Sequence, residues 1–300
     1  MGNFNFFKTI QIIIKSPQSG NIKIKGVLKH FIWQLNKMFK KFPLILKYSS
    51  SYLRINNSKI GSGALINALE LYDYNNMSLI KDLIKGNGVF FDVGANIGVY
   101  SILVSEQRSI MVHSFEPHPI TCSYLHENIE LNSRENIICN NLALTNSPNT
   151  TIKFTNYDSN SINHIVLNSS VSTDLIEVKA LSGYEYCTQH NVTPDFIKID
   201  VEGFELDVLM SFGKMIEKTK VLFIETKGEV TQNFLNRTSS ITQYLSDSFE
   251  FEGPFRLDFK AKTFFKVEPD NDIIEEDSIF ISKAMIEQKA NPLSNYKFVY

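Results

Sequence analysis

The sequence predicts an α/β fold with a largely parallel sheet covered by helices on both faces and preceded by a basic segment. From about residue 76, short apolar segments rich in β-branched and aromatic residues alternate with helical patterns. With 43% hydrophobic and 21% charged residues, the chain is neither disordered nor a coiled coil. Of the 30 basic residues, eleven lie in residues 1–69, which contain no acid, so residues 70–300 carry 19 basic and 32 acidic groups. The chain therefore combines a basic arm with an acidic body of net charge −13.

The basic arm contains a predicted amphipathic helix between Gly26 and Pro43. Apolar residues recur there at three- and four-residue steps, and lysines fall largely off that stripe. The stripe comprises Leu28, Phe31, Ile32, Leu35, Met38 and Phe39. Pro43 is expected to end the helix. Three interpretations are open: a helix docked on the body or at a subunit interface, an interfacial helix on an anionic membrane with Trp33 at the boundary, or a nucleic-acid contact.

A serine run and a polar stretch suggest a linker after this helix. Ser49–Ser51 are followed by the polar residues 56–63. We therefore expect a basic N-terminal arm over residues 1–65, a body over 66–283 and a C-terminal tail over 284–300.

The body is predicted element by element from its alternating pattern. The expected helices are Met77–Lys85, closed by glycines, Val99–Ser105, Pro119–Leu131, opened by a proline, and Leu206–Phe212. The expected strands are Val89–Val93, Met111–Glu116, Ile137–Asn140, Phe196–Asp200, Val221–Glu225, Phe249–Leu257 and Ser278–Ser282. The segment from Thr151 to Val178 is interpreted as an inserted hairpin, which could equally be a flap that covers an acceptor or a plain surface insertion.

A glycine-rich turn after the first strand of the body is the most informative stretch. Its sequence is Asp92-Val93-Gly94-Ala95-Asn96-Ile97-Gly98, which lets backbone N–H groups and a helix N-terminus approach a ligand. Ser101 stands where a dinucleotide fingerprint would have a third glycine, which disfavours a nicotinamide-dependent dehydrogenase. We expect Asp92 to lie near an ammonium or sulfonium group and Gly94, Ala95, Asn96 and Gly98 to bind the same ligand. A purely structural tight turn is the alternative.

Two further segments indicate a ribonucleoside ligand. Glu116 ends the second strand, eighteen residues beyond Gly98, where an acid in doubly wound folds accepts hydrogen bonds from ribose hydroxyls. Asn140-Asn141-Leu142-Ala143 follows the third strand, where an adenine would lie. Glu116, Pro117, Asn141 and Ala143 are therefore candidate cofactor-binding residues.

A carboxylate pair follows another buried strand. Asp200 and Glu202 come directly after Phe196–Ile199, at the sheet edge where ligands bind in such folds. Asp200 is expected to point into the cleft, whereas Glu202 and Glu205 could instead cap the following helix. Either acid of the pair could be a general base if burial raises its pKa, or the pair could hold a divalent cation such as Mg²⁺.

In this order, the three segments resemble the FkbM family of S-adenosylmethionine-dependent methyltransferases over about residues 76–283. The resemblance is carried by Asp92–Gly98, Phe115–Pro117 and Ile197–Glu205, with further agreement at Asn128–Asn132 and Val221–Glu225. One departure is that Leu181-Ser182-Gly183-Tyr184 stands where members usually carry a Leu-Asp-Asp-like segment.

The resemblance implies a Rossmann-like class I methyltransferase fold, with a seven-stranded, mostly parallel sheet whose last strand is antiparallel. The basic α-helical N-terminal arm lies outside it. It also implies methyl transfer from S-adenosylmethionine to an oxygen, which we expect to be a hydroxyl of a sugar, glycolipid or polysaccharide precursor. A non-catalytic S-adenosylmethionine-binding module or a partner protein in glycan biosynthesis is the alternative, motivated by Ser182 and Gly183.

The location and partners are expected from simple features. Three dispersed cysteines favour a reducing compartment, and no apolar run is long enough to span a membrane. The chain is therefore expected to be cytoplasmic, with peripheral contact to the inner membrane face through residues 1–54. The acidic body makes nucleic acid an unfavourable partner.

Overall fold

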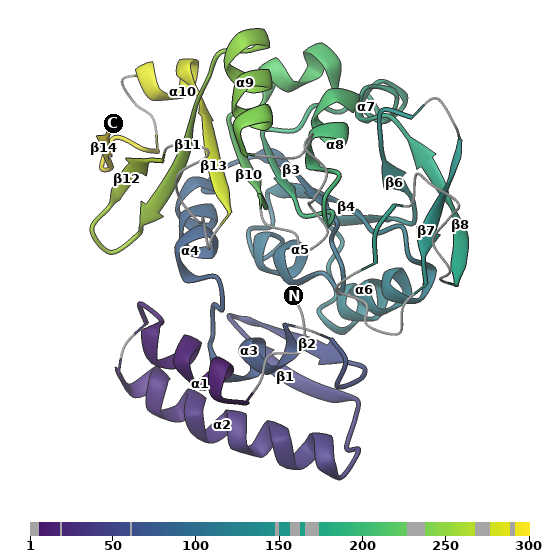
Figure 1. Cartoon of the computed structure of the whole chain (residues 1–300), viewed down its shortest axis with the longest axis vertical. Helices are drawn as coiled ribbons and strands as arrows, with labels where there is room; N and C mark the ends of the chain where they lie inside the picture. Colours follow the sequence, from purple (N-terminus) through teal and green to yellow (C-terminus); the bar gives the residue numbers. More distant parts are fainter. Residues whose placement is uncertain are drawn as a thin grey trace.

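The computed structural model describes residues 6–18, 20–60, 62–147, 150–156, 163–165, 174–226, 238–267, 277–288 and 292–300. In Figure 1, two N-terminal helices and a β-hairpin lie beside an α/β body built on one large sheet. No helix in these ranges has both the length and the apolar character needed to cross a lipid bilayer.

The main sheet has nine strands in the order β14-β12-β11-β13-β10-β9-β3-β4-β5. Their bounds are β3 Gly88–Val93, β4 Ile110–Phe115, β5 Ile137–Asn140, β9 Phe196–Ile199, β10 Val221–Ile224, β11 Phe251–Asp258, β12 Thr263–Lys266, β13 Ser278–Ser282 and β14 Lys297–Val299. Strands β5, β4, β3, β9 and β10 are parallel, and β13 is antiparallel to β10 and β11. The predicted seven-stranded sheet with an antiparallel last strand is therefore present, and β12 and β14 extend its edge.

Helices cover both faces of this sheet. Their bounds are α4 Tyr74–Leu83, α5 Val99–Val104, α6 Pro119–Leu131, α7 Gly183–His190, α8 Glu205–Ser211, the 3₁₀-helix η1 Gly213–Lys218, α9 Thr238–Ser248 and α10 Lys283–Glu287. Because side chains alternate along a strand, Phe90 packs with α4, α5 and α6 in one core, while Phe91 packs with α7, α8 and α9 in the other. Both faces of the strands are buried, which explains their nearly continuous apolar runs.

A small three-stranded sheet lies beside the main one. It contains β6 Ala143–Leu144, β7 Thr151–Thr155 and β8 Leu175–Leu181, in the order β6-β8-β7. Strands β7 and β8 pair antiparallel, as the hairpin interpretation predicts. Most of the segment between them lies outside the described residues.

The N-terminal segment contains α1 Phe6–Lys15, α2 Gly20–Met38, β1 Leu44–Tyr48, β2 Ser51–Ile55 and α3 Gly63–Ala68. Two expectations need correction. Helix α2 ends at Met38 rather than at Pro43, because Lys40 already has a left-handed φ of 51°. The serines at 49–51 are not a linker: Ser49 and Ser50 form the turn between β1 and β2, and Ser51 begins β2.

The β1–β2 hairpin is fixed to the body by polar contacts. The side-chain oxygens of Asn128 on α6 and of Asn132 at its C-cap accept hydrogen bonds from the backbone N–H groups of Arg54 and Tyr52, at 2.6 and 2.8 Å. Glu106, after α5, accepts hydrogen bonds from the hairpin turn, including one from the Ser49 hydroxyl at 2.8 Å. Because the basic segment is held at its hairpin end, helices α1 and α2 have a defined position.

Candidate active site

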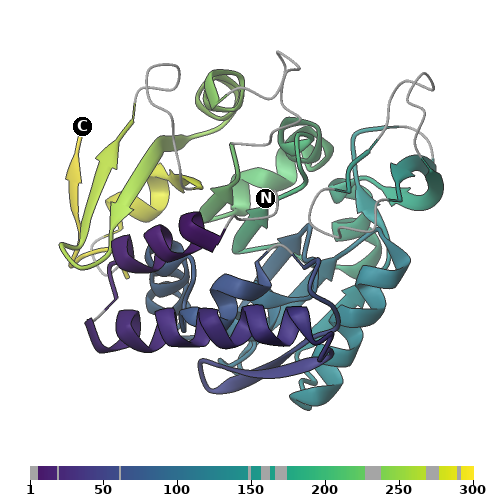
Figure 2. The ribbon, with the colours of Figure 1, turned by 60° about the horizontal axis from the view of Figure 1, so that its bottom comes forward.

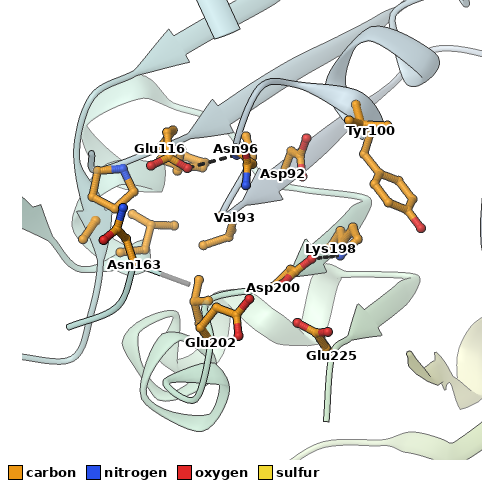
Figure 3. Close-up of a pocket in the computed structure, with 18 of the residues that line it drawn as sticks. Asp92, Val93, Asn96, Tyr100, Glu116, Asn163, Lys198, Asp200, Glu202 and Glu225 are labelled. Atoms are coloured by element: carbon orange, nitrogen blue, oxygen red, sulfur yellow. Dashed lines mark hydrogen bonds and ion pairs between the residues drawn. The ribbon is translucent and has the colours of Figure 1, made fainter. Parts of the chain in front are cut away.

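A pocket lies at the carboxyl ends of β3, β4, β9 and β10, and Figure 3 shows the side chains that line it. Nine of the eleven predicted site residues line this pocket. They are Asp92, Gly94, Ala95, Asn96, Glu116, Pro117, Ala143, Asp200 and Glu202. The predicted nucleoside residues and the predicted catalytic carboxylates therefore share one cavity, although the strands that carry them are far apart in the sequence.

The turn after β3 has no room for a side chain at Gly94. This residue has a φ of 82°, and a Cβ there would lie 1.8 Å from the carbonyl oxygen of Asp200. The N–H groups of Gly94 and Ala95 both donate to the carbonyl oxygen of Phe115, each at 3.0 Å. The turn is thus held between the ends of β4 and β9, and its position defines the floor of the pocket.

Gly98 and Asn141 do not line the pocket. Gly98 precedes α5 with a φ of 88°, and a Cβ there would meet the Leu125 side chain at 2.4 Å. Asn141 donates its side-chain amide to the carbonyl oxygens of Glu116 and Pro117, each at 2.9 Å. Both residues shape the backbone next to the pocket, so any effect they have on a ligand acts through other residues.

Asp92 is almost completely buried at the end of β3. Its carboxylate accepts a hydrogen bond from the Ser101 hydroxyl at 2.5 Å, and Ser101 lies 2.7 Å from the hydroxyl oxygen of Ser114. Burial raises the pKa of Asp92, and the bond from Ser101 partly opposes this effect. A cationic ligand beside Asp92 would favour the charged carboxylate.

Glu116 organises the backbone on the opposite side of the turn. One carboxylate oxygen accepts from the Asn96 N–H at 2.9 Å and the other from the His118 N–H at 3.0 Å. Burial raises the pKa of Glu116 to about 8, despite these two hydrogen bonds. Figure 3 shows Glu116 and Asn96 on the side of the pocket across from Asp200 and Glu202.

Three carboxyl groups gather on the other side of the pocket. Oxygens of Asp200, Glu202 and Glu225 all lie within 4.8 Å of one another. Burial, the charge of Asp200 and a hydrogen bond to it raise the pKa of Glu225, which favours the protonated form of this residue beside the charged Asp200. From the sequence, Glu225 at the end of the fifth parallel strand is a candidate for the acceptor side, with a helix cap or a solvent-facing position equally open. The structure places it in the lining of the pocket.

Lys198 is a buried cation beneath this cluster. Its ammonium lies 3.0 Å from a carboxylate oxygen of Asp200 and 3.6 Å from one of Asp277. Burial alone would raise the pKa of Asp200, but the ammonium and the bond with Glu225 outweigh it and lower that pKa. The condition that burial raises the pKa of a general base is therefore not met at Asp200.

The acids after Asp200 have different positions. Glu202 lines the pocket with a left-handed φ of 54°. Glu205 is buried, and its carboxylate accepts a hydrogen bond from the Gly203 N–H at 3.0 Å. Glu205 thus closes the loop before α8. It does not cap the helix, because the N-cap is Phe204 and no side chain makes a cap hydrogen bond there.

Several pocket residues were missed by reasoning from the sequence. Lys198 could have been found, because a lysine within a four-residue buried strand needs a carboxylate partner. Asp277, which pairs with Lys198 but does not line the pocket, could also have been found, since it directly precedes an antiparallel strand that begins at the edge where its parallel neighbours end. Ser62 and Tyr72 precede the body's first strand and carry no local signal.

Ser182 stands in the segment where the resemblance leads one to expect a Leu-Asp-Asp-like sequence, and in the structure it has a role in starting a helix. Ser182 is the N-cap of α7, where its hydroxyl accepts from the Glu185 N–H and the Glu185 carboxylate accepts from the Ser182 N–H. This reciprocal pair is a capping box. Neither Ser182 nor Gly183 lines the pocket.

The sheet order, with a pocket at the carboxyl ends of its parallel strands, defines the class as a Rossmann-like methyltransferase fold. The chain belongs to the methyltransferase FkbM domain family, whose model matches residues 92–252. It is 27% identical over 158 residues to the hexuronic acid methyltransferase AglP of Haloferax volcanii. That match covers 49% of this chain and 59% of the relative, which is less than two thirds of the relative's length.

Two solved structures match this chain at low similarity, one of them a methyltransferase. One from Agrobacterium tumefaciens, described as S-adenosylmethionine-dependent, has a TM-score of 0.42 and 10% identity, and the match covers 79% of this chain and 68% of that one. Trm5b from Pyrococcus abyssi has a TM-score of 0.40 and 16% identity, over 79% of this chain and 54% of that one.

Proposed function

We propose that this chain transfers a methyl group from S-adenosylmethionine to a hydroxyl group of a sugar, glycolipid or polysaccharide precursor. The observation that carries the proposal is the shared pocket, with Asp92 and Glu116 on the cofactor side and three carboxyl groups on the other side. The hexuronic acid methyltransferase among its relatives supports a sugar acceptor.

The cofactor side fits a nucleoside that carries a positive charge. Glu116 would accept hydrogen bonds from ribose hydroxyls, and Leu142 and Ala143 offer an apolar surface for the base. Asp92 would lie near the charged end of the cofactor. S-adenosylmethionine supplies an activated methyl group on a sulfonium, and the neighbouring side chains chiefly hold donor and acceptor in line.

Asp200 is proposed as the acceptor of the hydroxyl proton. As the new O–C bond forms and the S–C bond breaks, the hydroxyl becomes strongly acidic. Even the weakly basic carboxylate of Asp200, kept charged by Lys198, can then take its proton. Glu202 would orient the acceptor from the adjacent loop. The candidate flap contributes Phe154, Asn163 and Ile165 to the same pocket.

Asp200, Glu202 and Glu225 also fit a divalent cation, because their oxygens converge and carboxylates are preferred ligands of Mg²⁺. A bound cation would acidify the acceptor hydroxyl. Activity assays with EDTA and with added Mg²⁺ distinguish this arrangement from the Asp200 route, for which EDTA has no effect.

The central test separates binding from turnover. Calorimetry should give micromolar binding of S-adenosylmethionine to the purified chain, abolished in Asp92→Ala and in Glu116→Ala. Asp200→Asn should retain binding within a few fold but lower methylation of uronic acid and hexose glycosides, followed by mass spectrometry, by about 100-fold or more. Asp247→Asn, at an exposed position outside the pocket, is the matched control.

Two results would contradict the proposal in different ways. If the intact chain does not bind S-adenosylmethionine, the cofactor assignment is wrong. Binding without turnover on any hydroxylated acceptor would favour the alternative of a non-catalytic module in a glycan-biosynthesis assembly. The position of Ser182 in a helix cap outside the pocket speaks for the catalytic form.

A further inference from the structure

Helix α2 has apolar residues on two opposite sides. The side that packs on the protein carries Gly26, His30 and Trp33. The stripe that reasoning from the sequence singled out lies on the other side and is exposed; Leu28, for example, is 62% exposed and Met38 64%. Its members are Leu28, Phe31, Ile32, Leu35, Met38 and, just after the helix, Phe39, and Ile24, one turn before Leu28, is exposed on the same side. If α2 were an ordinary docked helix, this stripe would be the buried side.

The orientation of α2 is fixed by close contacts with α3. A Cβ on Gly26 would lie 2.8 Å from the carbonyl oxygen of Ala68, and a Cβ on Gly63 would lie 2.8 Å from the Trp33 ring. Rotating the helix to bury the stripe would separate both pairs and expose Trp33, which is now only 3% accessible. The stripe therefore stays on the surface.

Helix α1 extends the same surface. It lies alongside α2 in Figure 2, and the rings of Phe6 and Phe31 are 5.1 Å apart. Phe7 and Ile14 of α1 are exposed, as is the stripe of α2. We call these exposed apolar residues of α1 and α2 the α1–α2 face.

Lysines border this face. Lys25, Lys29, Lys37, Lys40 and Lys41 are exposed. No ion pair joins a lysine of α2 to another residue within the described ranges. The sequence has no acid before Glu70 that could neutralise them locally. The α1–α2 face thus combines a large apolar surface with an uncompensated positive border.

We propose that the α1–α2 face binds the surface of an anionic lipid bilayer, with both helices lying in the plane of the interface. The apolar stripe enters the acyl boundary, and the bordering lysines meet anionic headgroups. A symmetric contact between two copies would place the same lysines against each other, so charge disfavours a second copy as the occupant.

Membrane binding would bring the pocket close to the lipid surface. Ser62, which lines the pocket, directly precedes α3, and α3 packs on the buried side of α2. One helix layer thus separates the α1–α2 face from one wall of the pocket. The binding step itself involves no methyl transfer and is tested independently of it.

Co-sedimentation of the full chain with vesicles tests the proposal. Binding should occur on vesicles of phosphatidylcholine with phosphatidylglycerol. It should be at least tenfold weaker on pure phosphatidylcholine, and it should also weaken at ~0.5 M salt. The exposed double variant Leu28→Gln/Leu35→Gln should bind at least tenfold more weakly.

Charge variants and a matched apolar control sharpen this test. Lys25→Gln/Lys29→Gln should lower binding about 20-fold, whereas Lys283→Gln/Lys297→Gln, at exposed positions far along the chain, should change it little. Ile120→Gln/Met210→Gln, which removes exposed apolar residues outside the α1–α2 face, should bind like the natural chain.

The proposal is overturned if the chain ignores anionic vesicles, or if Ile120→Gln/Met210→Gln lowers binding as much as Leu28→Gln/Leu35→Gln. It is also overturned if light scattering finds a dimer that Leu28→Gln/Leu35→Gln converts to a monomer while vesicle binding stays absent. That result would assign the α1–α2 face to self-association.

Discussion

A Cβ at Gly94 would lie 1.8 Å from the carbonyl oxygen of Asp200, so the turn after β3 and the residue that follows β9 touch through their backbones. Strands β3 and β9 are neighbours in the sheet although about 100 residues separate them in the sequence. The contact fixes the two halves of the pocket relative to each other and explains why the turn needs a glycine at this point.

Gly94→Ala should lower the free energy of unfolding by about 3 kcal/mol or more and abolish S-adenosylmethionine binding. The methyl group collides with backbone, and the φ of 82° is unfavourable for any other residue. Urea unfolding and calorimetry measure the two effects. Gly86→Ala is the control, since a Cβ at Gly86 meets nothing within 4 Å and the variant should match the natural chain.

The stability of the chain should fall as pH rises from about 5 to 8, in part because of Glu116. Burial raises its pKa from 4.5 to about 8, so in this window the folded chain keeps a proton that the unfolded chain has lost. Each group that keeps its proton only in the folded chain lowers the free energy of unfolding by about 1.4 kcal/mol for every pH unit of increase in this window. Glu116→Gln should therefore flatten the pH dependence of unfolding by about 1 kcal/mol per pH unit.

The control for this measurement is Glu217→Gln, which changes an exposed carboxylate and should leave the slope as it is. An unchanged slope in Glu116→Gln would mean that Glu116 is ionised in the folded protein at neutral pH.

Lys198→Met should destabilise the chain by about 3 kcal/mol at neutral pH. The substitution leaves Asp200 and Asp277 without the buried ammonium that lies 3.0 and 3.6 Å from their oxygens. Lys220→Met provides the comparison, because Lys220 pairs with Asp195 at 2.7 Å but its side chain is half exposed. Its loss should cost less than about 1 kcal/mol. Equal costs in the two variants would contradict the assignment of Lys198 as a structural counter-charge.

Substitutions on the two sides of α2 should have unequal effects. Trp33→Ala should lower the free energy of unfolding by about 3–5 kcal/mol, because the ring is buried against α3. Leu35→Ala, two residues further along on the exposed side, should change it by about 0.5 kcal/mol or less. The reverse order in thermal or urea unfolding would show that the stripe, and not Trp33, faces the protein.

Local sequence features predicted much of the body. The helix Pro119–Leu131 and the strand Ile137–Asn140 have the bounds that the proline and the apolar pattern indicate. The turn from Asp92 to Gly98 and the acids at the ends of two strands were recognisable because parallel strands deliver their carboxyl ends to one edge. Helix α9 was missed, since its sequence contains only three large apolar residues, Ile241, Tyr244 and Leu245.

The side of α2 that faces the protein could not be predicted by the same reasoning. Amphipathic periodicity identifies an apolar stripe but not its partner, and the usual interpretation buries it. In this protein, small residues determine which side of α2 faces the protein, because Gly26 and Gly63 allow α2 and α3 to approach closely. The stripe of Leu28 and Leu35 is left outside.

By itself, the sequence determined the sheet class, the cofactor-side turn and the acids Asp92, Glu116, Asp200 and Glu202, because these depend on local patterns and on the ends of strands. Only the tertiary structure decided which groups meet. It joined Lys198 and Glu225 to Asp200, lowered the pKa of Asp200 where burial alone would raise it, and turned the stripe of α2 outward. The physical reason is that charge interactions and packing depend on distances between residues far apart in the chain, and no local pattern encodes those distances.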